Sequence, residues 1–113
     1  MTSDERQFLL TAAWLFMRHG RQDRALNVFE ALVEDDPRDG VAAVALAKVL
    51  LESGNATRAL AILREADIPR SLDHAAAVLE TRAMRMLGRM VEAKSRWNRY
   101  MKARKGAARQ WME

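Results

Sequence analysis

Three hexapeptides, GRQDRA, GNATRA and GRMVEA, recur along the chain at a constant interval of 34 residues. Each begins with a glycine and ends with an alanine, at Gly20 and Ala25, Gly54 and Ala59, and Gly88 and Ala93. A glycine readily adopts the left-handed conformation that ends a helix, and a small residue early in the next helix lets two helix backbones approach closely. Stacked repeats require equally spaced turns, whereas an ordinary helix bundle does not. The spacing therefore predicts three helical hairpins of one repeating architecture.

The residues between these turns have the composition and the periodicity of helices. Alanine, leucine, arginine and glutamate predominate, and the apolar residues recur at helical spacing. Asp36 precedes Pro37 and is expected to leave helical geometry, and Ser71 is the expected N-cap of the fifth helix. The pattern predicts six helices, over residues 5–18, 22–34, 40–53, 56–66, 72–87 and 90–105.

Length and composition limit the class of protein. A chain of 113 residues, half of them apolar, is expected to form one domain, with repeats at about 6–39, 40–73 and 74–107 and a basic tail at about 102–113. It has no cysteine, which excludes disulfides and thiol catalysis and fits a cytoplasmic location. The N-terminus MTSDERQ lacks the features of a secretory signal, and no apolar run approaches the ~20 residues of a membrane span. We expect a soluble, cytoplasmic protein.

Further positions agree when the chain is aligned on the 34-residue interval. Small residues align at Ala13, Ala47 and Thr81, and large ones at Phe16, Leu50 and Met84 and at Phe29, Leu63 and Trp97. This pattern resembles the tetratricopeptide repeat, which implies an all-α fold of three helix-turn-helix repeats in a short right-handed superhelix. The third unit departs from the pattern at Glu80, where an apolar residue is expected, and at Lys105, where a proline would stand. Its last helix is expected to run on into the basic tail.

The same resemblance implies a concave face, formed by the inward positions of the first helix in each repeat. Carried onto this chain, these positions are Leu10, Trp14, Met17, Val41, Val44, Lys48, Leu51, Val78, Arg82, Arg85 and Met86. We expect a partner helix or extended segment to cover this stripe, with Trp14 as its anchor. The alternative is that Leu10, Trp14 and Val44 pack among themselves. Under the first interpretation, Leu51→Asp should spare the fold and weaken partner binding.

Other kinds of function find little support in the sequence. His19 and His74 are isolated, no serine lies in a nucleophile elbow, and no phosphate-binding glycine loop occurs, so we expect neither an enzyme, a cofactor nor a metal site. The basic stretch RWNRYMKARKGAAR allows a nucleic-acid interpretation, with Trp97 and Tyr100 as stacking groups. We favour a solvated helix face instead, because both aromatic residues fall in repeat core positions.

The first half of the chain also resembles the YscY (SctY) class of type III secretion chaperones. The matching residues are Phe8, Leu9, Leu10, Trp14, Leu15, Gly20, Ala25, Ala31, Leu32 and Pro37, with Ala93 and Tyr100 in the last helix. The resemblance implies a small chaperone that binds an early export substrate of the YscX (SctX) class. It also implies docking on the cytosolic domain of the export gate (SctV class). The alternative is a general tetratricopeptide adaptor or a self-associating scaffold unconnected with secretion.

Overall fold

The computed structural model describes residues 1–112, and these contain six α-helices and one short 3-10 helix. The helices are α1 (Ser3–Arg18), α2 (Gln22–Asp35), α3 (Gly40–Glu52), α4 (Ala56–Glu65), η1 (Arg70–Leu72), α5 (Asp73–Met86) and α6 (Met90–Met112). The described residues form no strand, so the all-α prediction is confirmed. None of these helices combines the length and the apolar composition needed to cross a membrane.

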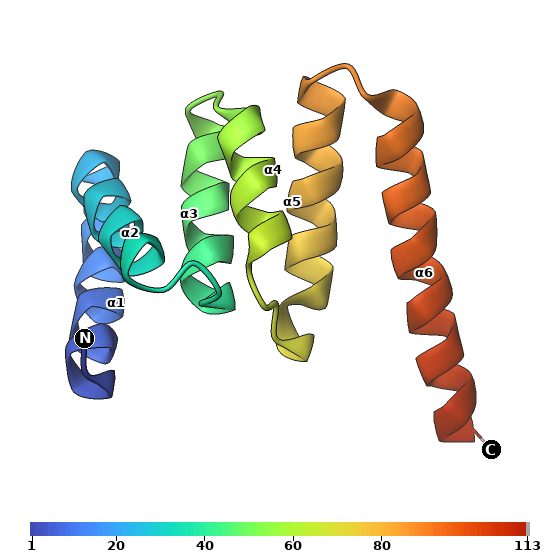
Figure 1. Cartoon of the computed structure of the whole chain (residues 1–113), viewed down its shortest axis with the longest axis horizontal. Coiled ribbons are helices and arrows are strands. Elements are labelled where there is room, and N and C mark those ends of the chain that lie inside the picture. Colours follow the sequence, from blue (N-terminus) through green and yellow to red (C-terminus); the bar gives the residue numbers. More distant parts are fainter. Residues whose placement is uncertain (113) are drawn as a thin grey trace.

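The helices pair into three hairpins, α1–α2, α3–α4 and α5–α6. Successive hairpins pack through α2 on α3, through α4 on α5, and through α3 on α5. The first helices of the hairpins, α1, α3 and α5, run in the same direction, and the hairpins follow one another across the molecule (Figure 1). The predicted stack of three repeating units is therefore confirmed.

The repeated glycines end helices and the repeated alanines are buried, as their spacing predicts. Gly20, Gly54 and Gly88 have φ angles of 71°, 86° and 74°. In each turn the residue after the glycine donates its backbone N–H to a carbonyl in the last turn of the helix before it, at 2.8 Å. The alanines five residues later are buried between the paired helices. Each hairpin is thus closed by one local device, used three times.

The helix boundaries differ from the prediction by at most two residues, except at the end of α6. Helix α1 begins at Ser3, because the Thr2 hydroxyl caps it by accepting the N–H of Glu5 at 3.1 Å. Ser71 as N-cap of the fifth helix is wrong: it lies within η1, and α5 begins at Asp73. The last helix continues through Lys105 to Met112, beyond the predicted boundary at 105, and so confirms the expectation that it runs on into the basic tail. Residue 113 of the predicted tail lies outside the described residues.

Ion pairs fix the connection between the first two hairpins. Asp36 is extended, with φ −144°, as expected before Pro37. Asp39 then caps α3 by accepting the N–H of Ala42 at 3.2 Å, and its carboxylate accepts two hydrogen bonds from Arg6 of α1, at 2.6 and 2.9 Å. The Arg6 guanidinium holds the pKa of Asp39 below its ordinary value. One aspartate therefore both starts α3 and joins it to α1.

A close backbone approach lies at the start of α3. A Cβ atom at Gly40 would overlap the backbone carbonyl of Asp67 and the ring of Pro69, in the segment that follows α4. The nearby Arg38 donates two hydrogen bonds to Asp67, and the backbone N–H of Asp67 donates to the carbonyl of Arg38 at 3.0 Å. The start of α3 and the segment after α4 are therefore held together along their backbones.

The core is continuous and centres on the middle hairpin. Its largest fully buried side chains belong to α2, α3 and α4, at Phe29, Leu32, Leu46, Leu51 and Leu63. Glu80 of α5 lies at the edge of this core, where the repeat pattern calls for an apolar residue, and forms an ion pair with Arg96 of α6. A charged pair within one hairpin thus takes the place of an apolar contact.

Candidate protein-interaction site

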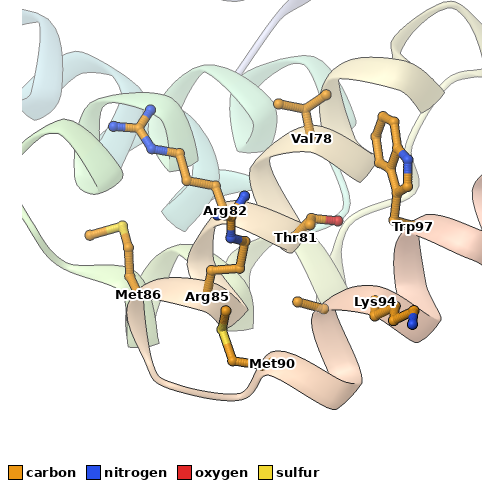
Figure 2. A pocket seen from close by; sticks show the side chains of 9 residues that line it. Val78, Thr81, Arg82, Arg85, Met86, Met90, Lys94 and Trp97 are labelled. Atoms are coloured by element: carbon orange, nitrogen blue, oxygen red, sulfur yellow. The ribbon is translucent and has the colours of Figure 1, made fainter.

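A groove with a volume of about 1010 Å³ lies between α5 and α6. Figure 2 shows its walls, with Val78 of α5 on one side and Trp97 of α6 on the other. The residues that line this α5–α6 groove are Val78, Thr81, Arg82, Arg85, Met86, Met90, Ala93, Lys94 and Trp97. Val78, Met86 and Met90 are exposed, Met90 to 56% of its surface. Large apolar side chains that gather in an open groove are typical of a binding surface.

Cations surround this apolar surface. Arg82, Arg85 and Lys94 are exposed, and none of them forms a salt bridge within residues 1–112. Elsewhere on the same hairpin, Arg96 pairs with Glu80 and Arg89 pairs with Glu92. The groove thus combines apolar side chains with cations that form no salt bridge within residues 1–112, which favours an amphipathic and acidic ligand.

Trp97 is held in place by a small aromatic cluster. Its ring lies 6.2 Å from that of His74, edge to face, and 5.4 Å from that of Tyr100, measured between centroids. Nδ1 of His74 and the hydroxyl of Tyr100 are 3.0 Å apart, within hydrogen-bond distance. A tryptophan with few accessible rotamers loses little entropy when a partner packs on it. Trp97 is therefore a better anchor for a ligand in this groove than a freely moving side chain would be.

The structure divides the predicted concave face into four groups of residues. Val78, Arg82, Arg85 and Met86 all line the α5–α6 groove. Trp14, Val41 and Lys48 are exposed on the first two hairpins, and Trp14, 46% exposed, packs edge to face on Phe29 with centroids 6.0 Å apart. Met17 and Val44 are half-buried against the core.

Two residues of the predicted face cannot contact a partner. Leu10 is 6% exposed and Leu51 is 2% exposed, and both belong to the core. The physical reason is that a further hairpin follows each of the first two. Arg85 stands 34 residues after Leu51, at the same position of the repeat, and is exposed in the last described hairpin. The expectation that Leu51→Asp spares the fold is therefore wrong.

Residues of α6 complete the groove, and the repeat pattern does not predict them. The concave positions of the pattern lie on the first helix of each repeat, so Met90 and Lys94 fall outside the predicted site, and Trp97 falls in a core position. In the structure Trp97 is half-buried and faces the groove. One feature of the sequence could have predicted this exposed face. Lys94 stands at the position of Leu60 in the repeat, and a lysine in a core position indicates a face that is not covered.

Two other surfaces are exposed. Phe8 and Leu15 project from α1, with Phe8 exposed to 72% of its surface. The residues from Lys102 to Met112 of α6 are exposed throughout, and Trp111, 91% exposed, lies near their end. Of the basic residues predicted to form a solvated helix face, Lys94 and Lys102 are exposed, whereas Arg96 is half-buried and pairs with Glu80. Within residues 1–112, no group of three or more histidine or carboxylate side chains is arranged to hold a metal ion.

Comparison with known proteins agrees with the repeat architecture. The family model described as "Tetratricopeptide repeat" matches residues 16–77, which is more than half of the chain. The match runs from the end of α1 into α5. A search among curated proteins found none that matches the chain.

Proposed function

The chain belongs to the tetratricopeptide repeat family, and on that premise we propose that it is a protein-binding chaperone of a type III secretion system. Its partner would be a small early-exported protein of the YscX (SctX) class. Membership of this family implies that the chain binds another protein. The specific role rests on the resemblance of residues such as Trp14, Gly20 and Pro37 to the YscY (SctY) class.

The observation that carries the proposal is the α5–α6 groove. Val78, Met86, Met90 and Trp97 present an apolar surface on one side of the last described hairpin, and a free protein with such a surface is prone to unspecific association. A chaperone acts by covering apolar helices of its substrate with a surface of this kind. The mechanism involves no covalent step, since binding alone keeps the substrate from aggregating.

The remaining exposed residues of the predicted face extend the contact. Trp14, Val41 and Lys48 lie on the first two hairpins, so a partner that reaches beyond the groove would meet them next. The complex of chaperone and export substrate then docks on the cytosolic domain of the export gate (SctV class). The proposed protein therefore acts in the cytoplasm. Truncation of Trp14 should then weaken partner binding more than most other changes on these hairpins.

Co-expression tests the proposal. The protein is produced alone and together with the small protein encoded beside its gene, and the mass in solution is measured by light scattering after size exclusion. A defined 1:1 heterodimer, with improved solubility of both chains, is expected. A monomeric, fully soluble protein that forms no complex with any small neighbouring product would contradict the chaperone role.

A self-associating scaffold is the second candidate, and one observation favours it. Phe8 and Leu15 are exposed on the outer side of α1, where the equivalent residues of α3, Ala42 and Val49, are buried. A second copy that covers this face would account for the exposed residues. Sedimentation equilibrium of the protein and of Phe8→Ser tests this, because a scaffold should lose its association when the phenylalanine is removed.

A further inference from the structure

The α5–α6 groove corresponds, in the 34-residue register, to a groove that is filled elsewhere in the molecule. In the middle hairpin the equivalent groove lies between α3 and α4, and α5 packs on both of these helices. On the last hairpin, α6 continues as one helix to Met112, so no described part of the chain turns back over its own groove (Figure 1). The α5–α6 groove is therefore the position that the next first helix of the stack would take.

The exposure of equivalent residues supports this correspondence. Leu51 and Leu60 are buried in the middle hairpin, whereas Arg85 and Lys94, which stand 34 residues later, are exposed. Ala56 is likewise buried and Met90 is exposed. In the middle hairpin the following helix covers these positions, and in the last hairpin no described helix does so.

Arg85 and Lys94, which stand where the middle hairpin has leucines, determine what kind of helix fits the groove. A helix docked as α5 is docked would cover Arg85 and Lys94, and burying two cations without partners is strongly unfavourable. Carboxylates on the incoming helix would turn this penalty into charge-assisted hydrogen bonds. On the basis of the proposed function, we infer that the α5–α6 groove receives one helix of the partner protein, which carries acidic side chains opposite Arg85 and Lys94.

The helix that fills the middle groove shows what the contact stripe requires. The buried residues of α5 include Ala76, Leu79 and Ala83. These three face the preceding hairpin, because the residues 68 positions earlier in α1, before which no hairpin is described, are the exposed Phe8, Thr11 and Leu15. Small residues thus lie on either side of one large residue. Alanine at these points lets the helix axes approach closely. The partner helix is therefore an amphipathic helix with an alanine and leucine stripe, flanked by glutamate or aspartate.

A second copy of the chain fits the groove poorly. The helix that would enter is α1, which has Phe8 and Leu15 where α5 has Ala76 and Ala83. Its carboxylates, Asp4 and Glu5, are in its first turn, and Arg18 is in its last turn. First helices run parallel in the stack, so Arg18 would approach Arg85, the residue in the last turn of α5. Repulsion and bulk both oppose this arrangement.

Two synthetic helices test the inference on the full-length chain. They share one alanine and leucine stripe that repeats the spacing of Ala76, Leu79 and Ala83, and differ only in having glutamates or lysines beside it. Isothermal titration calorimetry should show the glutamate helix binding at least about 10-fold more tightly than the lysine helix. The double variant Arg85→Glu/Lys94→Glu should reverse this preference. The matched control Arg99→Glu/Lys102→Glu changes the net charge equally outside the groove and should keep it.

Several outcomes would overturn the inference. The inference fails if neither helix binds or if both bind equally. It also fails if the groove variant keeps the original preference, or if the control variant loses this preference as completely as the groove variant does. Self-association of the chain that competes with the glutamate helix would assign the groove to a second copy instead. If the natural partner still binds the Arg85→Glu/Lys94→Glu variant while Trp14→Ala abolishes the complex, the proposed function stands and the helix assignment fails. If no partner binds at all, both fail.

Discussion

Leu51 and Arg85 occupy the same position of successive repeats, but replacing Leu51 with alanine should destabilise the protein strongly, whereas replacing Arg85 with alanine should hardly change its stability. Leu51 is 2% exposed, and its side chain is surrounded by the core of the middle hairpin. Loss of the transfer free energy of a buried leucine, together with the cavity left behind, lowers the free energy of unfolding by about 2–5 kcal/mol. Arg85 is exposed, and its replacement should change that free energy by less than about 0.5 kcal/mol.

Urea unfolding followed by far-UV circular dichroism measures both variants. Leu51→Ala should lower the urea midpoint with an unchanged dependence on denaturant, because the surface exposed on unfolding stays nearly the same. In a chain of this size, a loss of about 3 kcal/mol corresponds to a fall in Tm of roughly 10–15 °C. Leu51→Asp should be worse still, since a carboxylate would be buried without a partner. Equal stability of Leu51→Ala and Arg85→Ala would refute the assignment of Leu51 to the core.

Four further variants test other parts of the structure. Gly40→Ala should cost about 1–3 kcal/mol of stability, because its Cβ overlaps the backbone after α4, whereas Gly106→Ala, with open space around it, should stabilise the helix by about 0.5–1 kcal/mol in thermal melts. Asp39 has a pKa below that of the unfolded chain, so the stability it contributes is complete above pH ~4 and is lost as the pH falls through its folded pKa. Arg6→Gln should flatten the acid limb of a stability-against-pH curve, and an unchanged limb would exclude the pair as its cause. Ala59→Leu should destabilise the protein by about 1–3 kcal/mol through overpacking of α3 against α4, measured by urea unfolding.

The features that the sequence predicted best are those set by local chemistry. Gly20, Gly54 and Gly88 end helices through backbone conformations that depend only on the residue and its immediate neighbours. The alanines that follow them pack within the same hairpin, so their burial also follows from short-range spacing. Six helices and the repeat architecture could be predicted for this reason.

The features that it missed depend on which hairpin lies next in space. Leu10 and Leu51 satisfy the positional rule for a concave face, but their exposure is decided by the hairpin that follows. The pattern places Trp97 in the core because the equivalent Phe29 and Leu63 are core residues. At the last described hairpin the same position faces the groove. Position in the repeat therefore predicts orientation, and neighbours decide burial.

The unequal burial of the three hairpins bears on how the protein opens. Most of α3 is buried, with hairpins on both sides, whereas α6 has a single buried residue, Ala93. In a linear array each unit is stabilised chiefly by its nearest neighbours, so the ends fray first and the centre last. Amide hydrogens of α3 should exchange with solvent only through global unfolding, while those in the last turns of α6 exchange through local fluctuations. A ligand that binds between α5 and α6 would slow amide hydrogen exchange at this end of the array. The part of the chain that unfolds as one cooperative unit would then extend across the whole chain.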